Sequence, residues 1–410
     1  MNNSKFLDRA TPPHIVTLVV ISGLSALNMN LFLPSLPGIA THYHTDYALV
    51  QLAVSGYLGF TAILQLLIGP LSDRYGRRPV MLISLVIFLV ATALIPLAPT
   101  VESFLVIRML QASVVSGLVL SRAIIRDVVD TDQAASMIGY VTMGMTIAPM
   151  LGPALGGVLD EMFGWQSTFV ALFLAGLAVL ALAAADLGET NQHRSKSMLR
   201  QFGAYPELAR SRRFWGYTLT ATFASGAFFS FLGGGPFVAT EILGMTPSEL
   251  GFYLVFVAVG YMGGNFISGR YASRIGINRM MVSGGLIATS GMILSLVLFL
   301  AGLWHPFSFF GPILLVGLGN GITLPSANAG IVSVRPQLAG SASGMGGAMI
   351  IGGGAAMASL AGAILSAETG PYPLILVMLV SSIFGIFAAL YVLKVERSVA
   401  AAAPAVEPTA

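Results

Sequence analysis

The sequence predicts an all-α protein that crosses a membrane many times, with twelve transmembrane helices in two six-helix bundles. Three observations support this fold class. Of 410 residues, 56% are hydrophobic and only 9% are charged, against about 25% charged in ordinary soluble domains. Twelve apolar runs approach or exceed the roughly 20 residues that a helix needs to cross a bilayer. The longest polar gap, Leu187–Arg213, divides these runs into two sets of six.

The elements follow in order along the chain. Residues 1–14 lack a small-residue cleavage site, so the first apolar run is expected to be a retained span and not a signal peptide. The expected units are an N-terminus 1–14, a first bundle 15–186, a linker 187–213, a second bundle 214–397 and a disordered Ala- and Pro-rich tail 398–410. The expected spans are 15–36, 48–68, 80–98, 102–124, 133–159, 166–186, 214–240, 248–268, 280–303, 308–333, 339–366 and 372–393.

The charges predict the orientation of these spans. Lysine and arginine are enriched on the cytoplasmic side of membrane proteins. If the N-terminus is cytoplasmic, the inner segments hold nineteen of the twenty basic residues, and Arg108 lies inside a span. The outer loops then hold no lysine or arginine, and we expect both termini to be cytoplasmic. The acids of these outer loops and adjoining helix ends are Asp46, Glu102, Asp160, Glu161, Glu241, Glu249 and Glu368.

The stretch Gly69–Pro79, GPLSDRYGRRP, is expected to be a short loop between two spans. A generic basic loop would need arginines but not glycines and an acid at these spacings. The pattern resembles the signature loop of the major facilitator superfamily. The resemblance implies a conformational switch in which Asp73 caps the helix starting near Ala339 or pairs with an arginine in one state. The switch residues are Gly69, Asp73, Arg74, Gly76, Arg77 and Arg78.

An internal repeat is visible at an offset of 200 residues. Gly69, Arg74 and Gly76 recur as Gly269, Arg274 and Gly276. In the fifth and eleventh spans, Gly144, Met145 and Gly152 recur as Gly344, Met345 and Gly352. Each half has an even number of spans, so the two copies share an orientation. Substrate is then expected to bind between the halves near the membrane midplane.

Arg108 is the ionisable residue that lies well inside a span, with Gln111 one turn further in. A buried arginine is costly in lipid, so it should face a partner or a water-filled cavity. The alternative is an arginine near a helix end whose head group extends to the interface. The run Arg108–Gln111 resembles the fourth-helix motif of drug antiporters, which implies that Arg108 faces the central cavity.

The fifth span carries Gly152-Pro153 and Gly156-Gly157. Proline bends a helix, and glycines four residues apart allow a close helix crossing. The pattern resembles the antiporter motif of the exporter branch, which implies a pliable hinge and seal. Tight packing alone is the alternative.

Residues 30–37, NLFLPSLP, resemble the first-helix signature of the Bcr/CflA drug-resistance exporters. The family has an aspartate where Asn30 stands and a tyrosine where Phe32 stands. No acid lies in the middle of any span, although proton coupling needs a group that titrates near the working pH. We therefore expect an electropositive cavity at Arg108 that prefers neutral or anionic drugs to lipophilic cations.

Further substrate-binding candidates come from the helices that the superfamily uses. They are Ser225, Phe229 and Asn320, beside Asn30, Phe32, Arg108 and Gln111. His42 and His44 lack a third ligand, so no metal site is expected. No G-x-x-x-x-G-K loop is present, so ATP is not the expected energy source. No cofactor, nucleic-acid partner or enzymatic activity is expected.

The resemblance implies a multidrug efflux antiporter of the inner membrane that works by alternating access. Its expected partners are a drug or xenobiotic, the proton as coupling ion and the lipid bilayer, and we expect a monomer. The alternatives are an inward carrier of a nutrient or metabolite and, because of Asn30, an uncoupled facilitator. A membrane enzyme or sensor would need a polar catalytic cluster or an added soluble domain.

Overall fold

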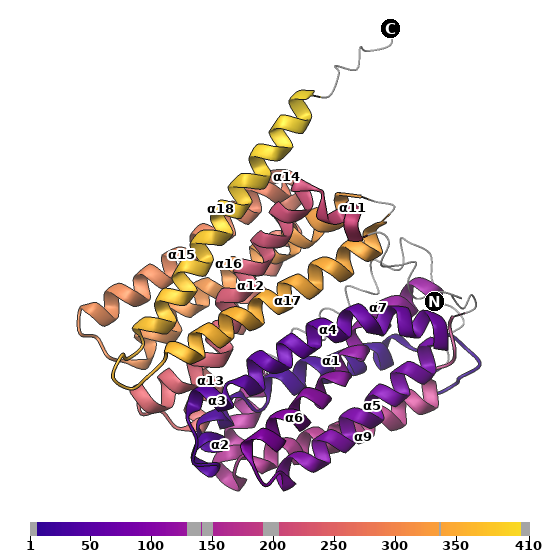
Figure 1. Ribbon diagram of the computed structural model, residues 1–410, viewed down its shortest axis with the longest axis horizontal. Coiled ribbons are helices and arrows are strands. Elements are labelled where there is room, and N and C mark those ends of the chain that lie inside the picture. The colour runs from indigo at the N-terminus through magenta and orange to yellow at the C-terminus, as the bar shows by residue number, and fades with distance from the viewer. Residues whose placement is uncertain (1–5, 129–140, 142–150, 192–204, 336–337, 403–410) are drawn as a thin grey trace.

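A computed structural model describes residues 6–128, 141, 151–191, 205–335 and 338–402. Within these residues, eleven helices are long and apolar enough to cross a membrane. The remaining expected span, 133–159, lies largely outside them, and its described part is a helix over 151–163. The all-α fold of two helical halves is confirmed, and Figure 1 shows the halves side by side, the first in indigo to magenta and the second in rose to yellow.

The first half contains the spans up to the linker. Its helices are α1 Ile15–Asn30, η1 Leu33–Ser35, α2 Leu36–His42, α3 Tyr47–Val50, α4 Leu52–Tyr75, α5 Arg77–Leu94, η2 Ile95–Leu97, α6 Val101–Gln111, η3 Ala112–Val115, α7 Ser116–Val128, the helix 151–163 and α9 Gln166–Asp186.

The second half begins after the linker, of which residues 192–204 are outside the described part. Its helices are α11 Tyr205–Ala209, α12 Arg212–Phe237, η4 Val238–Ile242, α13 Pro247–Tyr253, α14 Val255–Ile275, α15 Ile277–Leu300, α16 Pro306–Ser333, α17 Ala339–Ile364 and α18 Tyr372–Ala402.

Three boundaries differ from the sequence-based expectation. The first span continues through η1 and α2 to His42, because Pro34 and Pro37 lie in first turns, where proline is tolerated. The stretch 69–79 is not a loop, since α4 continues to Tyr75 and α5 starts at Arg77. Helix α18 continues to Ala402, so the expected disordered tail is helical at its start.

The repeat is visible in the backbone. Gly76 alone separates α4 from α5, with φ 105°, and Gly276 alone separates α14 from α15, with φ 88°. Positive φ favours glycine, because it has no Cβ to clash with the backbone. The two halves therefore turn at equivalent points. We call the end of the molecule that carries these turns the motif end.

Acids at the ends of the last helices join each half to its own first helix. Asp186 of α9 accepts hydrogen bonds from the backbone N–H groups of Leu7 (2.7 Å) and His14 (2.9 Å), just before α1. Glu396 of α18 accepts from Arg213 Nε (2.7 Å) and Tyr217 Oη (3.0 Å) of α12. These bonds fix the helix ends of each bundle at the motif end.

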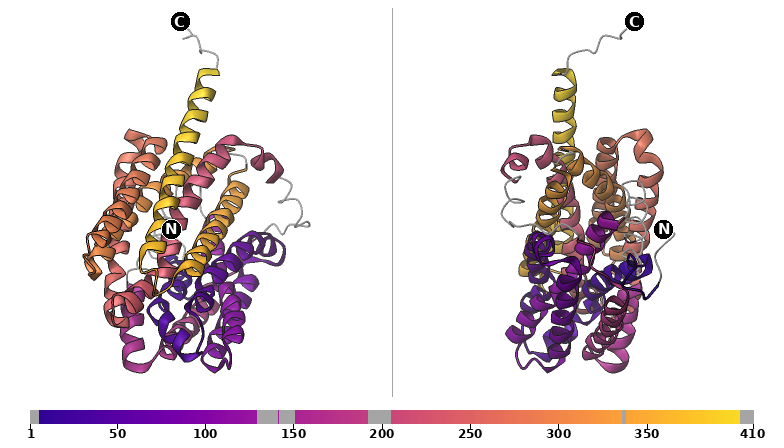
Figure 2. Two further views of the ribbon diagram at one scale, coloured as in Figure 1. Left: turned by 60° about the vertical axis from the view of Figure 1, so that its left-hand side comes forward. Right: turned by 90° about the vertical axis from the view of Figure 1, so that its right-hand side faces the viewer.

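The two halves meet at the opposite end, which we call the closed end. Helices α2 and η1 contact α12, η1 contacts α13, and α3 contacts α17. Figures 1 and 2 show the halves converging here and diverging toward the motif end. Helices α4 and α17 remain in contact between the two ends, where Ala62 lies against Gly352.

Candidate transport site

Arg108 lies inside the first bundle and not beside an open cavity. Its side chain is 0% exposed, so no solvent-accessible cavity reaches it in this structure, and its position facing the central cavity stays a prediction. Nη1 donates to Asn28 Oδ1 (3.0 Å) and to Gln111 Oε1, and Nη2 donates to the Asn28 carbonyl oxygen (3.0 Å). Nε donates to the Ala53 carbonyl oxygen (3.4 Å). The guanidinium is therefore bonded to α1, α4 and its own helix.

Two aromatic rings enclose the Arg108 guanidinium. Its central carbon lies 4.1 Å from the centroid of Phe32 and 4.4 Å from that of Tyr57. Aromatic faces attract cations, and the attraction is stronger away from water. Arginine suits this site better than lysine because it is planar and offers five donors.

The partners of Arg108 are all neutral. Within the described residues, no carboxylate forms a salt bridge with it. Hydrogen bonds and rings take the place of an acid in stabilising the buried cation.

Sequence reasoning missed Asn28 and Tyr57. Asn28 accepts from Arg108 and donates to Tyr57 Oη (3.1 Å), so it links α1, α4 and α6. Its spacing gave a signal, because Asn28 lies three residues after Ser25 and four before Phe32 on one helix face. Tyr57 is five residues into α4 and has no polar neighbour in sequence that would single it out.

Two other candidates of the first half are bonded within it. Gln111 donates to Thr92 Oγ1 of α5 (2.8 Å), which extends the network to a fourth span. Asn30, which stands where the family has its acid, is 4% exposed and donates to the Ala26 carbonyl oxygen of its own helix (2.7 Å). The Asn30 amide is therefore bonded within its own helix and not to Arg108.

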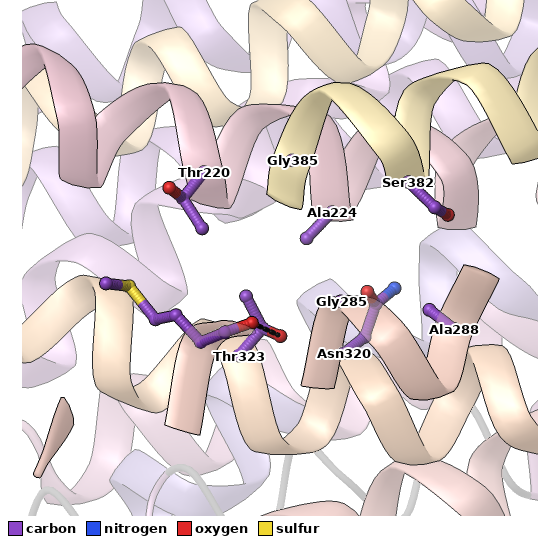
Figure 3. A pocket seen from close by; sticks show the side chains of 9 residues that line it. Thr220, Ala224, Gly285, Ala288, Asn320, Thr323, Ser382 and Gly385 are labelled. Carbon is purple, nitrogen blue, oxygen red and sulfur yellow. Dashed lines mark hydrogen bonds between the residues drawn. The ribbon is translucent and has the colours of Figure 1, made fainter. Parts of the chain in front are cut away.

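The candidates in the second half do not converge on Arg108. Asn320 lines a small cavity between α12, α15, α16 and α18, all of the second bundle, as Figure 3 shows. Its expected role in a substrate site between the halves stays a prediction. Phe229 of α12 lies against Gly354 of α17, and Ser225 is buried on α12.

At the motif end, Arg77 joins two acids. Its Nη1 lies 2.5 Å from Asp73 Oδ1, and its Nε donates to Asp127 Oδ2 at the end of α7 (3.0 Å). Pairing of Asp73 with an arginine is one of the two expected roles. Arg74 lies over the Tyr75 ring at 5.3 Å, and a Cβ on Gly69 would meet nothing within 4 Å.

The segment after α9 binds the same turn, which the sequence did not predict. The Glu189 carboxylate accepts from the backbone N–H groups of Arg77 (2.9 Å) and Arg78 (3.3 Å), where the positive end of the α5 dipole lies. Arg78 Nε donates to the Leu187 carbonyl oxygen (2.8 Å). Asn191 Nδ2 donates to the Asp73 carbonyl oxygen at the end of α4 (2.9 Å). This segment therefore caps both helices of the turn.

The glycines of the fifth span serve two different contacts. A Cβ on Gly156 would collide with the Leu31 carbonyl oxygen, so this glycine allows a close crossing with the first span. A Cβ on Gly157 would collide with the Pro247 carbonyl oxygen of α13, in the other half. A Cβ on Gly251 of α13 would in turn collide with the Pro153 carbonyl oxygen. Gly152 lies against Asn30. The pattern thus joins helices within a half and between halves.

Comparison with known proteins identifies the family. The model of the Major Facilitator Superfamily matches residues 18–359. The chain belongs to the major facilitator superfamily. It is 27% identical over 352 residues to a bicyclomycin resistance protein homolog of Haemophilus influenzae, covering 84% of this chain and 88% of that one. It is 30% identical over 321 residues to a chloramphenicol resistance protein of Pseudomonas aeruginosa, covering 77% and 76%. These relatives are consistent with the Bcr/CflA type that the motifs predict.

A solved structure shares the superfamily fold. A bacterial homolog of the human lysosomal transporter Spinster, in an inward-facing and occupied conformation, superposes with a TM-score of 0.74 at 17% identity. The match covers 93% of this chain and 96% of that chain. The superfamily fold of twelve helices is thereby confirmed for this chain.

Proposed function

We propose that this transporter exports small drug-like molecules across the cytoplasmic membrane by alternating access. The observation that carries the proposal is the set of relatives with antibiotic resistance in their names, matched over most of both chains. Halves that meet at one end and diverge toward the other support alternating access. The glycine pattern at 152–157, which resembles exporters, favours export over an inward nutrient carrier.

The charge distribution supports an orientation. The expected inner segments hold nineteen of the twenty basic residues. Of these, Arg74, Arg77, Arg78, Arg274 and Arg279 flank the turns of the motif end, and the positive-inside rule favours a cytoplasmic location for this end. Both termini are then cytoplasmic, and the closed end faces outward. In this orientation the structure corresponds to a state that is closed to the outside. In this state a drug enters the transporter from the cytoplasm.

Neutral drugs are the proposed substrates. The buried charge of Arg108 has no acidic partner within the described residues. In a medium of low dielectric constant, such a charge repels a nearby cation without direct contact. Chloramphenicol-like and bicyclomycin-like compounds would avoid this cost, whereas a quaternary ammonium drug would not.

Drug susceptibility in a pump-deficient bacterial host tests this function. Expression of the chain should raise the inhibitory concentration of chloramphenicol or bicyclomycin at least about fourfold. It should raise that of a quaternary ammonium compound less, because each 1.4 kcal/mol by which the binding free energies of two drugs differ changes the ratio of their affinities tenfold. The matched control is Asp73→Asn, which removes the charge paired with Arg77 and should abolish resistance at unchanged expression. Equal susceptibility with and without the chain would contradict drug export, and Asp73→Asn acting like the parent would contradict the switch.

The coupling ion is proposed to be the proton, by resemblance to the family. Asn30 favours a second candidate, an uncoupled facilitator, because an amide cannot exchange a proton as a carboxylate does. A pH-sensitive dye inside proteoliposomes separates the two. Drug-dependent proton movement in the parent supports antiport, and movement that appears only in Asn30→Asp supports the facilitator.

A further inference from the structure

We propose that Tyr47 and Gln51 form a latch that holds the closed end shut and must break for that end to open. The latch consists of these two residues and the carbonyl groups of Gly233 and Ala358 in the other half. The proposal rests on the alternating access proposed above and names the groups that set its balance at one end.

Two hydrogen bonds of the latch cross between the halves. Tyr47 Oη donates to the Gly233 carbonyl oxygen of α12 (2.6 Å), and Gln51 Nε2 donates to the Ala358 carbonyl oxygen of α17 (2.6 Å). Tyr47 and Gln51 are four residues apart, so they lie on one face at the start of the second span. The Tyr47 ring also packs against Phe237, with centroids 5.0 Å apart.

Glycines on the opposite half make room for the latch. A Cβ on Gly233 would collide with the Gln51 amide nitrogen, and a Cβ on Gly362 would collide with the Gln51 amide oxygen. The amide thus inserts between α12 and α17 at the two positions where both helices lack side chains. Any residue other than glycine at either position would exclude it from this place.

One polar atom of the latch is left without a hydrogen bond, which suits a contact that must open. Gln51 is 0% exposed, yet its Oε1 has no hydrogen-bond partner among the residues that the structure describes. A buried acceptor without a partner is unfavourable. When the halves separate, water can reach this oxygen and offset part of the loss of the bond to Ala358.

The halves also meet at a second contact of the closed end, which is made by backbone atoms and not by side-chain hydrogen bonds. There Gly157 and Gly251 allow the helix 151–163 and α13 to approach through backbone contacts. Close packing of this kind fits the shapes of the halves together. The hydrogen bonds that Tyr47 and Gln51 donate add a directional attraction between the halves at the latch.

Distance measurements between spin labels test the latch. The chain has no cysteine, so Asp46→Cys and Glu368→Cys give one exposed label in each half at the closed end. In this parent we compare Tyr47→Phe and Gln51→Leu, without drug and with excess chloramphenicol. The matched control is Tyr43→Phe, whose hydroxyl donates to the Ala98 carbonyl oxygen (3.0 Å) within the first half.

Each latch variant should raise the ratio of long to short distances about 2- to 10-fold, the effect of one hydrogen bond, while Tyr43→Phe matches the parent. Latch variants that superimpose on the parent, or a Tyr43→Phe shift of equal size, would overturn the latch. If a long distance appears in the parent with chloramphenicol but the latch variants do not increase it, only the latch fails. If no long distance appears in any sample, the proposed alternating access fails with it.

Discussion

At Arg108, a guanidinium buried among neutral groups links four spans of the first bundle through Asn28, Ala53 and Gln111. The sequence singled out this residue because it is the ionisable side chain well inside a span. It did not predict the direction of the side chain, because a lone arginine in a span suits a cavity and a polar cluster equally well. The carbonyl of Ala53 carries no sequence signal at all, and Tyr57 reads as an ordinary aromatic residue.

Replacement of Arg108 by lysine should destabilise the first bundle by about 2–4 kcal/mol and abolish efflux. Lysine keeps the charge but loses the planar contact with both rings, and it cannot reach all the acceptors at Asn28 and Gln111 together. Thermal unfolding in detergent measures the effect. Arg210→Lys, in the exposed linker, is the matched control, and an equal melting temperature for Arg108→Lys and the parent would contradict this role.

Among the elements, the two turns at Gly76 and Gly276 show how sequence and structure relate. Their glycines and the offset of 200 residues were visible in the sequence, and the equivalent backbone turns confirm the repeat. The sequence favoured a loop because prolines, charges and glycines cluster there. The structure instead has helix on both sides of one residue, since Pro70 is accommodated within α4 and Pro79 lies in the first turn of α5.

Alanine substitutions should rank these glycines by backbone strain. At Gly76, alanine would have to adopt a positive φ and its Cβ would collide with the Glu189 carboxylate. The free energy of unfolding is therefore expected to fall by at least about 1–2 kcal/mol. Gly276→Ala meets the positive φ alone and should cost about 1 kcal/mol. Gly69→Ala lies within α4 with open space around it, so it should be neutral or stabilising by up to about 1 kcal/mol.

Thermal unfolding of the three variants provides the ranking, and drug resistance provides the functional comparison. A Gly69→Ala variant that folds as well as the parent but loses resistance would support a switch role for Gly69 itself. A Gly76→Ala variant as stable as the parent would contradict the turn geometry described here.

For the whole molecule, the two halves and their repeat could be predicted from hydropathy, charge and spacing. The closed end could not. Its contacts join residues from different halves, such as Tyr47 with Gly233 and Gly157 with Pro247. Each of these residues has an ordinary reading on its own, and which pairs meet depends on the state of the transport cycle. Asn320 shows the same limit, since its helix has one face toward each neighbour and the sequence does not say which face is central.

The central claim is that this chain alone moves a neutral drug across a membrane, and chloramphenicol uptake into proteoliposomes tests it most directly. Purified protein is reconstituted with an imposed proton gradient, and labelled drug is followed with and without a protonophore, beside Asp73→Asn. The account predicts accumulation above protein-free liposomes that requires Asp73, and that collapses with the gradient if the proton is the coupling ion. Drug levels in parent liposomes equal to those in protein-free liposomes would contradict it.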